Sequence, residues 1–439
     1  MLLYDIEELF RIEKIKARWI LDSRARPTVE VEVKTGGNGV GRAAAPAGAS
    51  KGKHEAWELR DGGKAFKGYG VSKAVENINN IIAPALKGMD SRRQRNIDYK
   101  MIELDGTRNK SRLGANAIVA TSLAVAKAAA DTYGLPFFMY LGGKNARTLP
   151  TPMMNIINGG VHAGNDLAIQ EFMIVPVGAD RFSEALRIAS EVYLELKSYL
   201  KERYGPQAIN VGDEGGFAPP MRETREALSA LVESIKRAGY EPGVDVMLAI
   251  DAAASQFYDV EKGIYSIDGK ELSRTQLLEL YRQLVEEYPI ISIEDPFHEE
   301  DFQGFKDITR ELGSKILIVG DDLFVTSIER LRRGIREEAA NAILIKVNQV
   351  GTLTETIDVV YEALLNNYRA IISHRSGETE DTSIAHIAVA LNTGLIKTGA
   401  PARGERTAKY NELLRIEEFL GGEAVYLGAK AFRKHIRQT

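Results

Sequence analysis

The chain has 439 residues, a formal net charge of -4 and no cysteine. Its length suggests two domains, or one large barrel with an appendage. The lack of cysteine excludes disulfides, thiolate nucleophiles and zinc–thiolate sites. Hydrophobic residues make up 44% and charged residues 27%, a balance typical of soluble globular proteins and without the basic field that nucleic-acid binding needs. The N-terminus mixes acidic and apolar residues, unlike a signal peptide, and no stretch reads as a membrane span. We therefore expect a cytoplasmic protein with neither nucleic acid nor membrane as a partner.

The first part of the chain reads as strands followed by helices. In "TVEVEVK", Val29, Val31 and Val33 alternate with charged residues, which predicts a half-buried strand that ends in a Gly-rich turn. Helical patterns follow at 72–86 and 114–133, and the segment 141–152, with its Gly, Asn and Pro residues, is the best candidate for a linker. We predict a small α+β domain over residues 1–145.

From residue 146 to 439 short apolar runs alternate with amphipathic helices. The runs are "MMNII", "EFMIVPV", "AINVG", "VMLAI", "IISI", "KILIVG", "AILIK", "AIIS" and "GLIK". Repeated strand–helix units predict an α/β fold, a (β/α)8-type barrel that forms the catalytic domain. An open doubly wound sheet is the alternative.

Charged and polar side chains follow most of these runs. After any single strand, an acidic residue is usually a turn residue or a helix cap. In a barrel, however, the strand ends converge on one rim, so these side chains would meet in one mouth. The residues concerned are Asp213, Glu214, Asp251, Glu294, Asp295, Asp321, Asp322, Lys346, His374, Arg375, Ser376 and Lys397.

Crowded carboxylates need a counter-charge, and a divalent cation supplies one. Asp251, Glu294 and Asp321 come from consecutive runs and offer only oxygen ligands, which favours Mg²⁺ and then Mn²⁺. Lys346, Arg375 and Lys397 add positive charge, which suits an anionic substrate held between metal and cations, with the Ser376 hydroxyl beside Arg375.

Some candidates do not follow a strand. Gln170 and Glu171 stand at the start of "EFMIVPV"; if Glu171 belongs to the mouth, its strand runs opposite to its neighbours and the first two barrel strands form a hairpin. His162, in "NGGVHAGN", lies in a mobile active-site loop or a plain surface hairpin. Ser50, in "PAGASKGKHEA", lies in a lid or an ordinary loop.

Long motifs resemble those of the enolase (phosphopyruvate hydratase) family over nearly the whole chain. They include "LDSRARPTVEVEV", "NVGDEGGFAPP", "IEDPF", "VGDDL", "ILIKVNQVGTLTET", "SHRSGETEDT" and "IKTGAPARGERTAKYNELLRIEE". The resemblance implies a capping domain followed by the enolase kind of barrel, with one antiparallel strand. It also implies reversible Mg²⁺-dependent dehydration of 2-phosphoglycerate to phosphoenolpyruvate, in the cytoplasm, by a homodimer or an octamer of dimers. It makes no prediction about a secondary presence at the cell surface.

The resemblance also implies a role for each candidate. Two Mg²⁺ ions bind per site, one to the residues matching Asp251, Glu294 and Asp321 and the other with help from the residue matching Ser50. A lysine or histidine base with one or two Mg²⁺ ions is the established pattern of the enolase superfamily. The catalytic residues are the base Lys346, the acid Glu214 with its support Glu171, and His162, whereas Gln170, His374, Arg375, Ser376 and Lys397 bind the substrate.

The sequence departs from the family pattern at four places. Lys51 stands where the family usually has Thr, Ala25 and Arg26 replace a Gly-Asn pair, and Trp19 replaces a Glu that pairs across the dimer interface. Two other hypotheses stay open: an enzyme of the same superfamily acting beside a different carboxylate, and a barrel that only binds.

Overall fold

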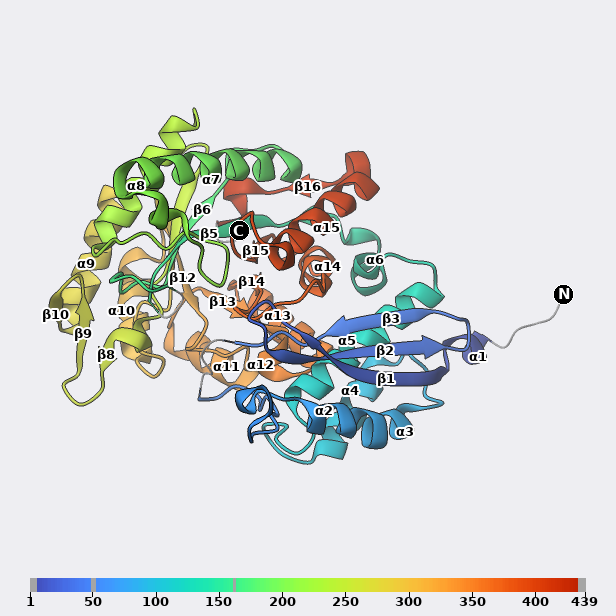
Figure 1. Ribbon diagram of the computed structural model, residues 1–439. Helices are drawn as coiled ribbons and strands as arrows, with labels where there is room; N and C mark the ends of the chain where they lie inside the picture. The colour runs from blue at the N-terminus through green and yellow to red at the C-terminus, as the bar shows by residue number, and fades with distance from the viewer. Residues whose placement is uncertain (1–5, 49–52, 161–162, 433–439) are drawn as a thin grey trace. The chain divides into compact units, whose positions relative to one another are not determined.

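The computed structural model describes residues 6–48, 53–160 and 163–432 (Figure 1). The chain divides into two compact units, and each is described by itself. Unit 1 comprises Met1–Ala146, Lys346–Val359 and His374–Leu391, and unit 2 comprises Arg147–Ile345, Val360–Ser373 and Asn392–Thr439. The proposed domains 1–145 and 146–439 are continuous blocks of sequence, and unit 1 contains two later segments in addition.

Unit 1 is built on a three-stranded antiparallel sheet in the order β1 (Ile12–Leu21), β2 (Pro27–Thr35) and β3 (Val40–Ala44), which lie side by side in Figure 1. The predicted alternation in β2 is confirmed, because Val29, Val31 and Val33 are all fully buried. One face of the sheet packs on helix α5 (Ala115–Thr132). The contact is so close that a Cβ at Gly41 would lie 2.0 Å from the carbonyl oxygen of Ala124, so only glycine fits there.

Both helices predicted in this part of the chain are confirmed. The first is one helical run with a π turn in its middle, α2 (Ser72–Asn77), η2 (Ile78–Ile82) and α3 (Ala83–Leu86). The other elements of unit 1 are α1 (Ile6–Phe10), η1 (Ala65–Gly68), α4 (Gln94–Asp105), α6 (Phe137–Gly142), η3 (Gly143–Asn145), α12 (Val347–Val350) and α14 (Ser383–Ala390), and α13 (Leu353–Leu365) is divided between the units.

Unit 2 contains a closed eight-stranded barrel, which confirms the predicted barrel against the open sheet. Its strands, in spatial order, are β11 (Ile290–Glu294), β12 (Leu317–Gly320), β13 (Ala342–Ile345), β14 (Arg369–Ser373), β15 (Leu395–Lys397), β5 (Thr151–Asn158), β6 (Glu171–Val175) and β7 (Met247–Asp251). Buried apolar side chains such as Met153, Met173 and Leu344 fill part of its core, as the close packing of protein interiors requires.

The barrel departs from a regular one at β6. This strand pairs antiparallel with β5 and with β7, whereas the remaining pairs are parallel. Because β6 runs backwards, its first residue, Glu171, lies opposite the last residue of β7, Asp251. The predicted hairpin and antiparallel strand are both confirmed.

One expectation about local structure was wrong. The run "AINVG" is not a barrel strand: its first residues belong to a 3₁₀ helix, η5 (Pro206–Ile209), and the rest is a loop. The segment 141–152, the predicted linker, contains the boundary between the units at Ala146 and Arg147, and it also contains the end of α6, the turn η3, strand β4 (Thr148–Leu149) and the start of β5.

The remaining elements of unit 2 surround or extend the barrel. They are α7 (Phe182–Tyr204), α8 (Thr224–Arg237), η6 (Ala254–Phe257), β8 (Tyr258–Asp259), β9 (Ile264–Ile267), β10 (Lys270–Leu272), α9 (Arg274–Glu287), α10 (Phe302–Leu312), α11 (Ile328–Glu337), α15 (Gly404–Leu420), η7 (Gly421–Glu423), β16 (Val425–Tyr426) and η8 (Gly428–Phe432). Within the described residues, no helix has the length and apolar character needed to cross a membrane.

Candidate active site

One lysine ammonium lies among three carboxylates at the end of the barrel. Lys397, the last residue of β15, has its Nζ 2.9 Å from Asp251 Oδ2, 2.9 Å from Glu294 Oε1 and 3.2 Å from Glu171 Oε1. The side chains are 0–5% exposed. They meet because β7 and β11 end side by side, with Glu294 opposite Asp251, and β6 begins beside them.

The cluster contains three carboxyl groups and one ammonium, and their close packing shifts the pKa values of Glu294, Glu171 and Lys397. Burial raises the pKa of Glu294 well above its usual value, and the charge of Asp251 adds to the rise. The pKa of Glu171 is raised in the same way, by burial and by the neighbouring Glu214. Burial by itself would lower the pKa of Lys397, but the carboxylates around it raise that pKa well above the usual value. Three carboxyl groups face one ammonium, so the carboxylates, if all were ionised, would carry more negative charge than Lys397 can compensate.

The donor set fits a divalent cation. Glu294 Oε2 is buried and finds no hydrogen-bond partner within the described parts of the chain. Buried carboxylate oxygens normally have partners, and a hard cation such as Mg²⁺ would provide one.

A second group of carboxylates lies at the ends of β11 and β12. Ligand oxygens of Asp295, Asp321 and Asp322 all lie within 4.8 Å of one another. Asp295 takes a left-handed backbone conformation, with φ 41°, and its carboxylate accepts the backbone N–H of Asp321 at 2.9 Å and of Asp322 at 2.7 Å. This trio shares only Asp321 with the predicted ligands Asp251, Glu294 and Asp321. The bonds suggest that Asp295 orients the Asp321 loop, a role that the sequence pattern did not reveal.

Glu214 lies on a loop. The sequence predicted that it follows a barrel strand, and that prediction was wrong. Its Oε2 accepts a hydrogen bond from Asn155 Nδ2 at 3.1 Å, and both residues are buried. Helix α15 and the residue before it fix the loop, because Arg406 Nη2 donates to the Asp213 carbonyl at 3.0 Å and Arg403 Nη1 donates to the Gly212 carbonyl at 3.1 Å.

Neither Asn155 nor Arg406 had been singled out from the sequence. Asn155 was detectable, because it is an amide inside the apolar run "MMNII", and buried polar groups need a specific partner. Gln170, which had been singled out, donates from its Nε2 to Asp251 Oδ2 at 3.5 Å, next to the Lys397 cluster.

The remaining predicted residues belong to unit 1 or lie outside the described chain. Lys346 follows β13 directly as the residue before α12, and it is half-buried. His374, Arg375 and Ser376 follow β14 and are all buried. The two residues that no described segment contains are Ser50 and His162.

Arg375 has a partner that the sequence did not suggest. Its Nη1 lies 3.0 Å from Glu55 Oε2, and its Nη1 also donates to Asn348 Oδ1 at 3.1 Å. Glu55 lies in the segment that had been considered for Ser50 alone, so nothing in the local pattern pointed to it.

Comparison with known proteins gives one consistent family. Residues 12–141 match the family described as "Enolase, N-terminal domain", and residues 146–435 match "Enolase, C-terminal TIM barrel domain". The chain is similar to the protein named Enolase of Thermococcus gammatolerans, with 62% identity over 428 residues, 98% of this chain and 99% of the relative. It is 63% identical over 416 residues to Enolase of Methanocaldococcus jannaschii, covering 95% of this chain and 97% of the relative. Enolase of Corynebacterium kroppenstedtii is 56% identical over 422 residues, 96% of this chain and 98% of the relative.

Proposed function

The chain belongs to the enolase family and is therefore a hydro-lyase of glycolysis, and we propose how its own residues divide the reversible dehydration of 2-phosphoglycerate to phosphoenolpyruvate. The observation that carries the proposal is the cluster of Lys397 with Asp251, Glu294 and Glu171, at 2.9 to 3.2 Å. A cluster with surplus negative charge at the end of a barrel suits a reaction that needs a bound cation.

We propose Asp251, Glu294 and Asp321 as the ligands of one Mg²⁺, with Ser50 helping to hold a second, and Mn²⁺ as a possible substitute. The orphaned oxygen of Glu294 supports the assignment. When bound, Mg²⁺ would stabilise the negative charge that develops on the substrate carboxylate. Asp295 would then act indirectly, because its hydrogen bonds orient Asp321.

Lys346 is the proposed base, and it takes the proton beside the substrate carboxylate onto its Nζ. It immediately follows a fully buried strand, β13, and such a rigid support limits the movement of a catalytic side chain. The proton is weakly acidic, since its loss places a second charge on the carboxylate, so the base needs electrostatic help.

Glu214 is the proposed acid that protonates the departing hydroxyl, with Glu171 as its support and His162 as a further catalytic residue. The hydrogen bond from Asn155 holds the Glu214 carboxyl in place. Glu171 lies close enough to Glu214 for charge and hydrogen bonding to couple them. Two coupled carboxyls favour keeping one proton between them, which an acid requires.

Arg375 and Ser376 are the proposed phosphate ligands, and His374, Gln170 and Lys397 complete the substrate site. A guanidinium presents a planar array of donors that matches a phosphate. Lys397 has a second proposed role. Its ammonium contacts three carboxylates, including the proposed metal ligands Asp251 and Glu294, and so holds these ligands together.

The direct test is an ultraviolet assay of 2-phosphoglycerate, whose dehydration gives a conjugated product. Absorbance should rise with Mg²⁺ and should stop rising when a chelator is added. Glycerate, which lacks the phosphate, is the control substrate and should give no signal. A chain that leaves 2-phosphoglycerate unchanged at saturating Mg²⁺ would refute the reaction, and equal activity on glycerate would favour another enzyme of the superfamily.

Exchange of the substrate α-proton with solvent deuterium tests the division between base and acid. Lys346→Ala should abolish the exchange, because exchange depends on the base alone. Glu214→Gln should impair the overall reaction and still allow some exchange. Exchange that survives in Lys346→Ala would assign the base to another residue.

We also propose the cytoplasm as the compartment and a homodimer, or an octamer of dimers, as the assembly. Both proposals rest on the family to which the chain belongs. Light scattering on the purified protein measures the assembly, and cell fractionation measures the compartment.

A further inference from the structure

The guanidinium of Arg375 is held from one side by a carboxylate that lies 320 residues away in the sequence. Arg375 Nη1 lies 3.0 Å from Glu55 Oε2, and Arg375 Nη2 lies 3.2 Å from Glu55 Oε1. The side chains are 5% and 9% exposed. Two parallel bonds of this kind fix the plane of a guanidinium as well as its position.

Helix α12 supports both members of this pair. Asn348 Oδ1 accepts a hydrogen bond from Arg375 Nη1 at 3.1 Å, and Gln349 Nε2 donates to Glu55 Oε1 at 3.3 Å. The helix begins at Val347, directly after Lys346. The segment that follows the proposed base therefore also orients the proposed phosphate ligand.

A small cavity lies beside the pair. Its volume is about 10 Å³, enough for about one water molecule. The lining residues include Pro46, Glu55, Glu58, Asn116, Asn348 and Arg375. The groups that hold the guanidinium in this structure include Glu55 and Asn348.

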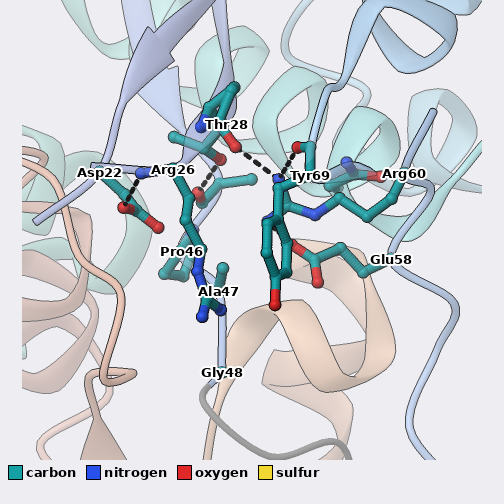
Figure 2. Close-up of polar contacts among 12 residues, drawn as sticks. Asp22, Arg26, Thr28, Pro46, Ala47, Gly48, Glu58, Arg60 and Tyr69 are labelled. Carbon is teal, nitrogen blue, oxygen red and sulfur yellow. Dashed lines mark hydrogen bonds and ion pairs between the residues drawn. The ribbon is translucent and has the colours of Figure 1, made fainter. Parts of the chain in front are cut away.

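The backbone ties the segment before Glu55 to the segment that carries Arg375. The amide of Ala47 donates to the carbonyl of Gly377 at 2.8 Å, and the amide of Gly377 donates to the carbonyl of Ala47 at 2.8 Å. In Figure 2 a dashed line joins Asp22 to Arg26, whose amide donates to Asp22 Oδ1 at 2.9 Å. A Cβ at Gly377 would lie 2.7 Å from Asp22 Oδ2, so these segments pack closely around a glycine.

We propose that Glu55 is a positioning residue for phosphate recognition: it holds the Arg375 guanidinium, before substrate arrives, in the orientation that receives the phosphate. The proposal rests on the proposed function, in which Arg375 is the phosphate ligand. An arginine side chain has many rotamers, and fixing it in advance removes an ordering cost from substrate binding. Glu55 acts through Arg375 and does not touch the substrate.

The test compares ligands that have a phosphate with one that lacks it. In Glu55→Gln we expect the KM for 2-phosphoglycerate to rise about tenfold while kcat changes by less than about threefold, since a ground-state contact is lost. The inhibition constant of inorganic phosphate should rise by the same factor as the KM, and that of glycerate should stay unchanged. Glu55→Asp keeps the negative charge. Its KM for 2-phosphoglycerate should lie between those of wild type and Glu55→Gln, about threefold above wild type.

Glu58→Gln is the matched control. Glu58 lies in the same segment and lines the same cavity, but it pairs with Arg60 (Figure 2). This variant should change none of the constants by more than about twofold. A Glu55→Gln variant without a cooperative thermal transition is not properly folded. In that case the binding of phosphate and glycerate is compared in Glu55→Asp instead.

The outcomes separate this inference from the proposed function. A wild-type chain that makes no product from 2-phosphoglycerate contradicts the function itself. An active wild type in which Glu55→Gln tightens phosphate binding, or weakens phosphate and glycerate equally, overturns only the role of Glu55.

Discussion

Two lysine–carboxylate contacts of almost equal length have opposite effects in the two units. In unit 1, Lys127 Nζ lies 2.8 Å from Asp381 Oδ2, and although desolvation acts to raise the pKa of Asp381, Lys127 lowers it below the usual value. In unit 2, Lys397 Nζ lies 2.9 Å from Asp251 Oδ2 and from Glu294 Oε1, and the pKa of Glu294 is raised by burial and by Asp251. The difference is the charge count, one to one in the first and one to three in the second. A balanced pair stabilises the fold, whereas an unbalanced cluster is suited to receive a further cation.

The largest expected effect comes from removing one carboxylate of the unbalanced cluster. Glu294→Gln removes a proposed metal ligand, and we expect activity on 2-phosphoglycerate to fall about a thousandfold. The melting temperature should not fall, because Lys397 keeps two other carboxylates and crowding is relieved. Activity assays and thermal denaturation measure the two effects.

Glu279→Gln is the control for that prediction. Glu279 is an exposed carboxylate of α9 that pairs with Arg282, and its loss should leave activity unchanged. A marked drop in the melting temperature of Glu294→Gln would mean that the cluster exists for stability, as the Lys127–Asp381 pair does.

The second-largest expected effect is a loss of stability when the ammonium of Lys397 is removed. Lys397→Met leaves three buried carboxylates without their cation, and we expect the free energy of unfolding to fall by about 3 kcal/mol. Urea denaturation at neutral pH measures it. Lys306→Met, which removes an exposed lysine 3.6 Å from Glu338, should change stability little. Equal stability of Lys397→Met and wild type would show that the ammonium is not needed to hold the carboxylates.

A smaller loss is expected when the balanced pair is broken. Lys127→Met should lower the free energy of unfolding by about 2 kcal/mol, since it leaves the mostly buried Asp381 without its cation. Activity should remain close to that of wild type. A thousandfold loss of activity in Lys127→Met would abolish the distinction between the two sites.

The smallest expected effect is a pH dependence of the stability that the Lys127–Asp381 pair contributes. The folded pKa of Asp381 lies below its usual value of 3.8, so the pair contributes stability above about pH 4 and loses it as pH falls through the folded pKa. The stability difference between wild type and Lys127→Met should therefore be largest near neutrality and shrink as pH falls towards and through the folded pKa of Asp381, because Asp381 without Lys127 takes up its proton at a higher pH. A difference that grows in acid would reverse the assigned sign.

The barrel was predictable from the sequence because its strands are short apolar runs between amphipathic helices. The reversed strand β6 was predictable from one residue, Glu171, which stands before its run and not after it. "AINVG" was misassigned because a short apolar run does not distinguish a strand from a loop. Here the chain closes locally, with the amide of Gly212 bonded to the carbonyl of Gly216 at 2.8 Å.

The partners of the candidate residues were much harder to predict. Residue types and strand ends suggested Arg375, but Glu55 is its partner only because tertiary folding joins positions 320 residues apart. Its position after a strand suggested that Asp295 reaches the rim, but its bonds to the Asp321 loop depend on the register of two strands. Sequence patterns indicate which groups reach a rim, whereas hydrogen-bond partners depend on packing.

Calorimetric titration of the purified chain with Mg²⁺ tests the central claim most directly, namely that the surplus carboxylates at the barrel end form a metal site. Wild type and Lys127→Met should bind Mg²⁺ with the same affinity, whereas Glu294→Gln should bind it at least about tenfold more weakly. Equal Mg²⁺ affinity in wild type and Glu294→Gln would contradict the account.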